Sequence, residues 1–307
     1  MPKPIVVVGS LNIDLIFRVP KLPAPGETRL ASDFLQTFGG KGANQAVMAA
    51  RLGAAVSLIG KVGDDGFGAS YLRHLQQEGV NTGGVSAVAE AATGLASICV
   101  DDNSANCIIV HSGANSLLLI GDVRKHAEKL RSAAMVIAQL ETPMDATTEA
   151  FRIARSAGVP TLLNPAPAQP LSRELLGFTT LLIPNEHELK ELSGHTCRSD
   201  EETLAAARSL REQGPETVIV TLGERGSVIC DNEVARHILA PKVKVVDTTG
   251  AGDAFCGALA VGVAENQQFD AAVRFATHAA ALAVTRPGTQ VSFPHRADVV
   301  AAMRVTS

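Results

Sequence analysis

Short hydrophobic runs alternate with longer amphipathic stretches along most of the chain. The short runs are residues 5–8, 56–59, 135–138, 161–163, 181–183 and 217–220, and each is predicted to be a buried strand. The amphipathic stretches, which predict helices, are residues 43–52, 68–78, 122–132, 147–157, 186–192 and 201–213, followed by the alanine-rich residues 254–264 and 271–284. This alternation predicts an α/β fold in which helices cover both faces of a mostly parallel sheet.

Two segments interrupt the alternation. Residues 14–38 combine several prolines with alternating apolar residues, and residues 94–111 predict a hairpin with strands at 95–100 and 107–111 about a polar turn at 101–104. We expect the two segments to pair as a small antiparallel sheet that projects from the main body and acts as a lid over a site. A purely structural extension of the sheet edge is the alternative. Because no linker separates large units, we predict one domain over residues 1–307.

Composition and charge exclude several classes of protein. The 307 residues are 46% hydrophobic and 19% charged, which is typical of a globular chain with a sizeable core. The net charge of −4, without a basic run, gives no reason to expect a nucleic acid or an anionic membrane as a partner. No apolar run approaches the ~20 residues of a membrane span, and the start of the chain lacks a signal-peptide pattern. The absence of tryptophan and the single tyrosine argue against an aromatic platform for bases or polysaccharides.

The cysteines indicate a compartment. Cys99, Cys107, Cys197, Cys230 and Cys256 are scattered and show no CxxC spacing. An odd, scattered set is typical of free thiols in a reducing environment. We therefore predict a cytoplasmic protein without a disulfide framework or a zinc site.

A glycine-rich motif precedes the first predicted helix. Residues 39–45 read Gly-Gly-Lys-Gly-Ala-Asn-Gln and lack the spacing of a Walker A loop. Glycines let a backbone approach a ligand closely, a helix N-terminus offers free N–H groups, and Lys41 and Asn44 add donors. A polar-ligand site and a simple turn before a helix explain this motif equally well.

A second motif of small residues opens a later helix. Residues 247–255 read Asp-Thr-Thr-Gly-Ala-Gly-Asp-Ala-Phe and follow a strand-like run at 243–246. Consecutive small residues at a helix start form a nest of N–H donors that stabilises charge on a phosphoryl group in transfer. Asp253 beside the nest is placed to accept the proton of an attacking hydroxyl, and we favour this role over a helix cap.

Other polar residues follow predicted strands. Asn12 and Asp14, after the first strand, suit the hydroxyls of a polyol, and an Asx turn in a loop is the alternative. Residues 184–188 (Pro-Asn-Glu-His-Glu) suit Mg²⁺ with its water shell as well as a capped helix start. Residues 221–226 (Thr-Leu-Gly-Glu-Arg-Gly) predict a tight strand-to-strand turn that lines a nucleotide. Glu141, at a strand end, is a further substrate candidate, and a simply solvated side chain is the alternative. His111 and His278 are expected to pack or to form hydrogen bonds, because they lack the spacing of a triad or metal site.

The two motifs, in this order and some two hundred residues apart, resemble the signatures of the ribokinase-like, or PfkB, carbohydrate kinase family. The resemblance covers nearly the whole chain and extends through residues 12–14, 25–28, 111–115, 139–141, 164–168 and 284–286. It implies an eight- or nine-stranded, mostly parallel sheet between helices, with a small β-sheet lid that often mediates homodimers. It also implies ATP-dependent transfer of the γ-phosphoryl group to the 5-hydroxyl of ribose.

The resemblance also implies roles for individual residues. Asp253 is the catalytic base, and Gly250, Ala251 and Gly252 form the anion hole. The sugar contacts are Asn12, Asp14, Gly40, Lys41, Gly42, Ala43, Asn44, Glu141 and Asp253. The ATP contacts are Asn185, Thr221, Gly223, Glu224, Arg225, Gly226, Gly252 and either Thr277 or His278. Glu188 serves Mg²⁺, and Asp247, Thr249, Ala283, Arg286, Gly288 and Ser292 hold a monovalent cation, usually K⁺.

The sequence leaves two alternatives open. A deoxyribokinase or another small-sugar kinase of the same family would carry most of the same motifs. A non-catalytic sugar-binding protein on this fold would keep the pocket but lose the base or the anion hole, and both are intact in this sequence.

Overall fold

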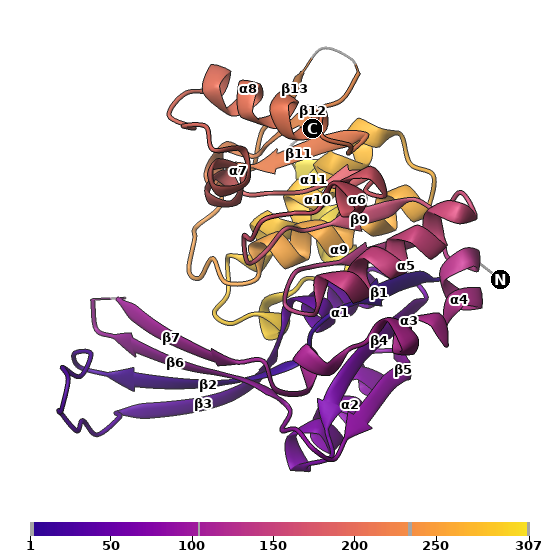
Figure 1. Cartoon of the computed structure of the whole chain (residues 1–307). Coiled ribbons are helices and arrows are strands. Elements are labelled where there is room, and N and C mark those ends of the chain that lie inside the picture. Colours follow the sequence, from indigo (N-terminus) through magenta and orange to yellow (C-terminus); the bar gives the residue numbers. More distant parts are fainter. Residues whose placement is uncertain (1–2, 104, 233–234, 306–307) are drawn as a thin grey trace.

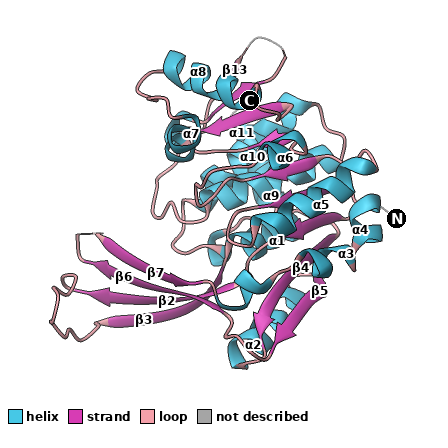
Figure 2. Cartoon of the chain, in the orientation of Figure 1, coloured by secondary structure: helices cyan, strands magenta, loops and turns pink. Residues whose placement is uncertain are grey.

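A large central sheet with helices on both faces forms the body of the chain, and a smaller sheet projects from it (Figures 1 and 2). The structure, a computed structural model, describes residues 3–103, 105–232 and 235–305. These two sheets confirm the predicted α/β architecture with a β-sheet extension.

Within the described residues, the central sheet has nine strands in the order β13-β12-β11-β10-β9-β8-β1-β4-β5. Their bounds are β1 Ile5–Val8, β4 Val56–Gly63, β5 Val80–Val88, β8 Met135–Ala138, β9 Thr161–Leu163, β10 Leu181–Leu182, β11 Thr217–Thr221, β12 Ser227–Cys230 and β13 Arg236–Ile238. All neighbours pair in parallel except β11–β12 and β12–β13. The six predicted central strands are confirmed, whereas the polar edge strand β5 and the short β13 carry little hydrophobic signal.

Two layers of helices cover the sheet. One layer contains α1 Lys41–Arg51, α2 Gly66–Gln77, α9 Ala251–Ala264, α10 Phe269–Ala283 and α11 Arg296–Val305. The other contains α3 Ile120–Arg124, α4 Ala127–Ser132, α5 Met144–Ser156, α6 Arg173–Gly177, α7 Glu186–Ser193 and α8 Asp200–Arg211. Successive side chains of β1 enter opposite layers, with Val7 in the first core and Val8 in the second. This is why the run at residues 5–8 is apolar throughout.

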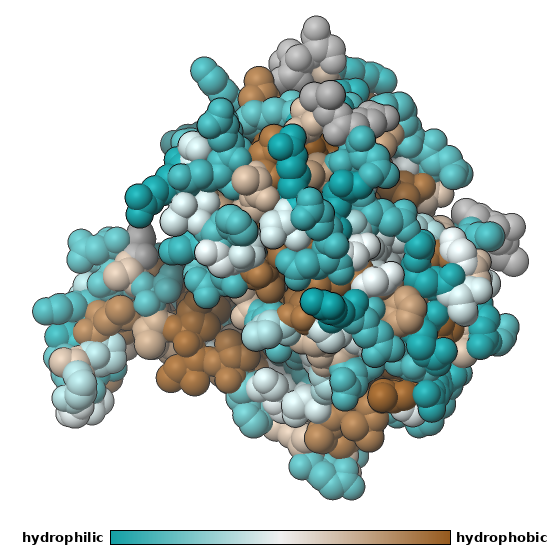
Figure 3. Space-filling view, turned by 45° about the horizontal axis from the view of Figure 1, so that its top comes forward, coloured by the Kyte–Doolittle hydropathy of each residue, from teal (hydrophilic) through white to brown (hydrophobic). Residues whose placement is uncertain are grey.

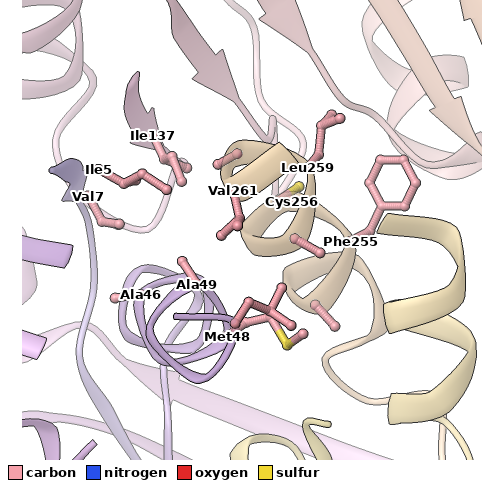
Figure 4. Close-up of a cluster of buried hydrophobic side chains, with 14 of the residues drawn as sticks. Ile5, Val7, Ala46, Met48, Ala49, Ile137, Phe255, Cys256, Leu259 and Val261 are labelled. Atoms are coloured by element: carbon pink, nitrogen blue, oxygen red, sulfur yellow. The ribbon is translucent and has the colours of Figure 1, made fainter. Parts of the chain in front are cut away.

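Helices α1 and α9 pack closely together beside β1, as the core in Figure 4 shows. Ala46 and Ala49 of α1 are small, and a Cβ added to Gly257 of α9 would lie 2.8 Å from the carbonyl oxygen of Gln45. Small residues therefore allow the two helix backbones to approach. Both helices begin at the glycine motifs, so this packing brings the two motifs together.

The projecting sheet, called the lid below after its expected role, is built from both predicted segments. It consists of β2 Asn12–Val19, β3 Asp33–Gly39, β6 Gly94–Asp101 and β7 Asn106–His111, in the order β3-β2-β6-β7. The hairpin β6–β7 is confirmed, although Ser104 in its turn lies outside the described residues. The prediction of an antiparallel sheet is wrong at its centre, because β2 and β6 pair in parallel. Strand β2 follows the carboxyl end of β1, and β6 follows the carboxyl end of β5. Because β1 and β5 run in the same direction in the main sheet, β2 and β6 leave it in the same direction.

Two further predictions need correction. Residues 243–246 form no strand, because the amide of Val246 donates to the Val284 carbonyl at the end of α10, 2.8 Å away, rather than to a strand. The single helix predicted over residues 122–132 is two helices, α3 and α4. Asp122 accepts from the Leu119 amide and pairs with Lys61 of β4, which fixes α3 against the sheet, and α4 begins anew after His126.

No helix within the described part of the chain combines the length and hydrophobicity that crossing a membrane requires.

Candidate active site

The order of the strands locates the site. The sheet runs from β1 through β4 to β5 on one side and from β8 to β11 on the other, so the chain order reverses between β1 and β8. In open α/β sheets, ligands bind at the carboxyl ends of the strands beside such a switch point. A cavity of about 140 Å³ lies at these ends, and Lys41, Asn185, Glu188, Thr221, Gly252 and Asp253 are among its lining residues.

Asp253 is a buried carboxylate on the wall of this cavity. It lies in the first turn of α9 with 6% of its surface exposed. Its Oδ2 accepts from Asn44 Nδ2 at 2.9 Å, and its Oδ1 accepts from Gln45 Nε2 at 3.0 Å. Burial raises the pKa of Asp253, although Lys41 and the two amides oppose the rise. A fixed carboxylate with a raised pKa is suited to accept a proton near neutral pH.

The start of α9 beside Asp253 is open to a ligand. Gly250 has a φ of +78° and no side chain caps the helix, so amides of its first turn lack partners within the helix. The Ala251 amide donates to the Thr248 carbonyl at 3.2 Å. A Cβ added to Gly252 would meet no protein atom within 4 Å. Amides without helical partners at a helix N-terminus, beside open space, are suited to bind an anion.

A second layer of amides holds the two partners of Asp253. Gln45 accepts from Gln139 Nε2 at 2.7 Å and also donates to Asn164 Oδ1 at 3.2 Å. Asn44 Oδ1 accepts from Gln290 Nε2 at 2.9 Å, and the same nitrogen of Gln290 donates to Tyr71 Oη. The amides of Asn44 and Gln45 therefore cannot rotate freely, and both present N–H groups to Asp253.

Glu141 joins three elements at the edge of the site. Its Oε2 accepts from the Ser10 hydroxyl and, at 3.0 Å, from the amide of Lys41, the first residue of α1. The Gly42 amide donates to Ser10 Oγ at 3.3 Å, and a Cβ on Gly42 would lie 2.5 Å from Gly9 backbone. The glycine at position 42 thus lets α1 begin against the end of β1.

Asp14 and Asn12 lie at the base of the lid, on β2 rather than in a loop, so the Asx-turn alternative is wrong. Asn12 Oδ1 accepts from Asn115 Nδ2 at 2.7 Å. Burial, together with the nearby charges of Glu141 and Asp253, raises the pKa of Asp14 to about 7. A Cβ on Gly39 of the neighbouring strand β3 would lie 2.1 Å from Asp14 Oδ2. The glycine at this position therefore leaves room for the Asp14 carboxylate.

The partly buried Lys41 places a cation among these carboxylates. Burial alone would lower the pKa of Lys41, but Asp253, Glu141 and Glu188 outweigh burial and raise it. Burial also raises the pKa of Glu188, against the Asn185 amide and Lys41. The cavity therefore holds the ammonium group of Lys41 among acidic groups. An anionic ligand would be attracted by Lys41 and the amides of α9 and repelled by the carboxylates.

The predicted ATP residues lie on two loops. Asn185 caps α7, with its Oδ1 accepting from the Glu188 amide at 2.8 Å, and both carboxylate oxygens of Glu188 accept from Asn185. Thr221 ends β11, and a short turn at Gly223–Arg225 leads into the antiparallel β12, which confirms the strand-to-strand turn. Arg225 pairs with Glu186 and Asp200. The turn is thereby fixed to α7 and α8.

The predicted cation residues are brought together in part. Asp247 Oδ1 accepts from the amide and hydroxyl of Thr249, and its Oδ2 accepts from the Gly288 amide at 2.9 Å. Ser292 lies buried, with its hydroxyl donating to Thr289 O. Burial would raise the pKa of Asp247, but these hydrogen bonds lower it. An ionised carboxylate thus joins the loop before α9 to the loop after α10.

Other candidates lie elsewhere. The Thr277 hydroxyl donates within α10 to Val273 O, and His278 Nδ1 contacts Arg274 O. A larger cavity of about 410 Å³ opens at the amino ends of β8, β10 and β11, and its Arg236 is paired with Asp231 and Asp270. That cavity lies at the edge of the sheet opposite the switch point, so we place the active site in the smaller one.

Comparison with known proteins gives the family. The profile described as "pfkB family carbohydrate kinase" matches residues 3–296. The chain belongs to the PfkB family of carbohydrate kinases. A ribokinase of Haemophilus influenzae is 40% identical over 300 residues, covering 98% of each chain. A deoxyribokinase of Salmonella typhi is 39% identical over 291 residues, covering 94% of this chain and 95% of that one.

Solved structures agree in fold. Arabidopsis thaliana ribokinase, complexed with ribose and ATP, has a TM-score of 0.93 and 33% identity and covers 99% of both chains. A Thermotoga maritima ribokinase has a TM-score of 0.89 at 35% identity, covering 98% of this chain and 99% of that one. The PfkB fold, with its main sheet and smaller sheet, is therefore shown for this chain.

The sequence gives a weaker signal for the amides that surround the candidate site. Gln45 lies in the first motif, and Gln139 and Asn164 directly follow predicted strands, which is a signal for a site at the carboxyl ends of the strands. Asn115 and Gln290 carry no comparable signal. Their partners are 103 and 246 residues away in the chain.

Proposed function

We propose that this PfkB kinase transfers the γ-phosphoryl group of ATP to the 5-hydroxyl of D-ribose, which yields ribose 5-phosphate and ADP. The observation that carries the proposal is the pairing of Asp253, buried and held by two amides, with the open amides at the start of α9. A base and an anion site within one helical turn suit phosphoryl transfer to a hydroxyl. The ribokinase relatives and the ribokinase structure with ribose and ATP support the substrate pair.

The chain's own residues perform three tasks in this reaction. Asp253 accepts the proton of the 5-hydroxyl as its oxygen attacks the γ-phosphorus, and the bond from that phosphorus to the bridging oxygen of ADP breaks. The amides of Gly250, Ala251 and Gly252 stabilise the charge on the transferred group, and Lys41 adds a positive charge beside them. Asn44 and Gln45 keep both oxygens of Asp253 in place.

Two cations fit the residues present. Glu188, on the cavity wall, offers a carboxylate whose oxygens retain free lone pairs, and Mg²⁺ in kinases uses one or two carboxylates with waters and phosphates. Bound there, Mg²⁺ would neutralise phosphate charge. For K⁺, Asp247 already connects the loops that contain Thr249 and Gly288. Further oxygen ligands would come from Ala283, Arg286 and Ser292. A monovalent cation there would stiffen the loop that carries Gly250.

The nucleotide contacts proposed are Asn185, Thr221 and the turn through Gly223, Glu224, Arg225 and Gly226, with Gly252 and Thr277 or His278. Asn185, Thr221 and Gly252 line the cavity. The sugar contacts proposed are Asn12, Asp14, Gly40, Lys41, Gly42, Ala43, Asn44 and Glu141. Asp14 and Glu141 lie close enough for Glu141 to raise the pKa of Asp14, so both act in one pocket.

The preference for ribose or for 2-deoxyribose would distinguish a ribokinase from a deoxyribokinase, the two activities named among the relatives. Asp14 bridging two adjacent ring hydroxyls would leave a buried acceptor unpaired when the 2-hydroxyl is missing, and such a loss is costly. We expect kcat/KM with ATP and Mg²⁺ to be at least about tenfold higher for D-ribose than for 2-deoxy-D-ribose. Equal values, or a preference for deoxyribose, would support a deoxyribokinase. No turnover with any sugar would support a binding protein.

The raised pKa of Asp14 predicts a dependence on pH. The carboxyl releases its proton near 3.8 when unfolded and at about 7 when folded, so the folded state holds more protons between these values. The free energy of unfolding therefore falls as pH rises through this window. Asp14→Asn should raise Tm at pH 8 more than at pH 5. It should also raise KM for ribose and remove the fall in KM that we expect between pH 6 and 8 as Asp14 ionises.

Thermal unfolding and KM measured across this pH range test the prediction. The matched control is Asp33→Asn, an exposed carboxylate at the other end of the lid strands. Equal Tm changes at pH 5 and 8 in Asp14→Asn would contradict the assignment of a raised pKa. A pH-independent KM in the wild type would contradict a sugar contact through the ionised carboxylate.

We further propose that the lid joins two copies into a homodimer. Leu35, Ile108 and Val110 are each more than half exposed, and the register places them on the lid face that carries Asp14. Figure 3 shows hydrophobic surface on the lid and where it meets the body. A second copy would cover this apolar face and protect the edges of the sheet.

Light scattering on a sizing column tests the dimer. We expect twice the 31.9 kDa chain mass for the wild type and the single mass for Ile108→Glu. Ile109→Glu is the matched control, because Ile109 is 67% exposed but points to the other face of the lid. A monomeric wild type, or dissociation by Ile109→Glu alone, would contradict the proposed interface.

The compartment and the domain boundaries complete the proposal. We propose one domain over residues 1–307 and a cytoplasmic location, where ATP is plentiful and a reducing environment suits a chain whose five cysteines are all free thiols in the structure.

A further inference from the structure

Two of the five cysteines face each other across the lid hairpin. Cys99 of β6 and Cys107 of β7 are direct partners in the antiparallel register. Side chains directly opposite in such a pair point to the same face of the sheet, with Cβ atoms about 4.5–5.5 Å apart. Cys99 is partly buried and Cys107 is exposed, and both are free thiols. The phosphoryl-transfer chemistry uses neither of them.

The hydrogen-bond pattern of the hairpin sets their backbone spacing. The Asp101 amide donates to the Ala105 carbonyl at 2.9 Å, which makes residues 101 and 105 a hydrogen-bonded pair. Such pairs alternate with non-hydrogen-bonded ones along an antiparallel ladder, so Cys99 and Cys107, two positions further, form a hydrogen-bonded pair with Cα atoms about 5.5 Å apart. Disulfides span Cα distances of about 4.4–6.8 Å. The Cα spacing therefore falls within the disulfide range, whereas the two Cβ atoms must come about 1 Å closer to reach the spacing of about 3.5–4.5 Å in a disulfide, so the two strands adjust locally when the bond forms.

The thiols lie on the lid face opposite to Asp14. The register places Phe34, Phe17, Cys99 and Cys107 in one row across the four strands, and the rings of Phe17 and Phe34 are 5.1 Å apart. Asp14 and Ile108 lie on the other face. An oxidant can therefore reach Cys107 from solvent without entering the sugar pocket or the proposed dimer interface.

We propose that Cys99 and Cys107 form a dithiol site that low-molecular-weight disulfides of the glutathione type oxidise reversibly to an intrachain disulfide. The exposed Cys107 thiolate attacks the small disulfide, forms a mixed disulfide and releases one thiol. The Cys99 thiolate then attacks the Cys107 sulfur, closes the intrachain bond and releases the second thiol. Two protein thiols are oxidised and one small disulfide is reduced to two thiols, with the two protons carried by the released thiols.

The site should be labile in both directions. The bond closes a loop of only a few residues within a hairpin that is already folded, so it removes little entropy from the unfolded chain. An exposed disulfide is also accessible to an attacking thiolate, which is the property of reducible disulfides rather than structural ones. Oxidation ties the edge strand β7 covalently to β6, its neighbour in the lid sheet. The ratio of disulfide to dithiol at this site would thus follow the redox state of the surroundings.

Peptide mapping of the full-length protein tests the proposal directly. Trypsin leaves residues 74–124 as one peptide, because no lysine or arginine lies between Arg73 and Arg124, and Cys99 and Cys107 are its sole cysteines. After treatment with oxidised glutathione and alkylation of remaining thiols, we expect this peptide unalkylated and lighter than the reduced form by two hydrogens. Cleavage before Asp101 or Asp102 should leave the two halves joined until a reductant separates them. Reduced glutathione in excess should restore two alkylatable thiols.

A shifted thiol is the matched control. Cys107→Ser should abolish the mass loss, and Asn106→Cys added to Cys107→Ser should not restore it, because residue 106 points to the opposite face and pairs with Val100. Stoichiometric binding of a trivalent arsenical that blocks alkylation in the wild type alone is a second expected result. The proposal is overturned if Cys107 stops at the mixed disulfide, if the bond joins two copies of the peptide, or if the shifted thiol closes as readily as the native one.

Discussion

Replacing Asp253 by asparagine is expected to lower kcat by about 10³-fold while leaving the affinity for ribose within a few-fold of the wild type. The amide keeps the size of the side chain but cannot accept the proton of the 5-hydroxyl. It also turns one acceptor of the Asn44 and Gln45 amides into a donor, so part of the loss will come from a disturbed side chain. Turnover by coupled ADP detection and ribose affinity by calorimetry separate the chemical step from binding.

Glu128→Gln is the control for Asp253→Asn. It makes the same carboxylate-to-amide change on a side chain that is 89% exposed on α4, and we expect unchanged kinetics. Near-native turnover in Asp253→Asn would remove Asp253 as the base. Loss of ribose binding with unchanged kcat at saturation would make Asp253 a sugar contact alone.

Gly250→Ala is expected to lower kcat by about 10²-fold, the cost of losing one aligned donor of an anion site. Gly250 has a φ of +78°, and an added Cβ would lie 2.5 Å from Cγ2 of Thr289. The loop before α9 must therefore shift, and with it the amides that face the cavity. Thr289 lies in the loop held by Asp247. We therefore expect the addition of K⁺ to increase kcat by a smaller factor in the variant than in the wild type.

Gly66→Ala is the matched control for Gly250→Ala. Gly66 also begins a helix, but its φ is not positive and its Cβ would meet nothing within 4 Å. Wild-type kinetics are expected for it. A Gly250→Ala enzyme with wild-type kcat and K⁺ response would show that the amides of this turn do not stabilise the transferred group.

The sequence predicts those parts of the site that are local in the chain. Residues 5–8 predict β1 because both faces of that strand are buried and all four residues are apolar. The glycines of residues 39–45 and 247–255 predict the starts of α1 and α9. Asp253 could be singled out because it lies within three residues of the glycines that open its helix. Each of these signals is contained in fewer than ten consecutive residues.

The parts that the sequence does not reveal depend on distant contacts. Gln290 begins a short 3-10 helix that has no clear signal in the sequence, yet its side chain contacts Asn44, Tyr71 and His74. The parallel pairing of β2 with β6 follows from where β1 and β5 end in the main sheet, not from the residues of either strand. The valines at 243–246 alternate with lysine as a strand does, but the amide of Val246 reaches Val284 rather than a strand.

The most direct test of the proposed function is the identity of the product. The purified protein, incubated with ATP, Mg²⁺, K⁺ and D-ribose, should form ribose 5-phosphate in an amount equal to the ADP released, as phosphorus and carbon NMR of the mixture would show. A phosphate on another hydroxyl, or ADP released without any sugar phosphate, would contradict a ribose 5-kinase whose base is Asp253.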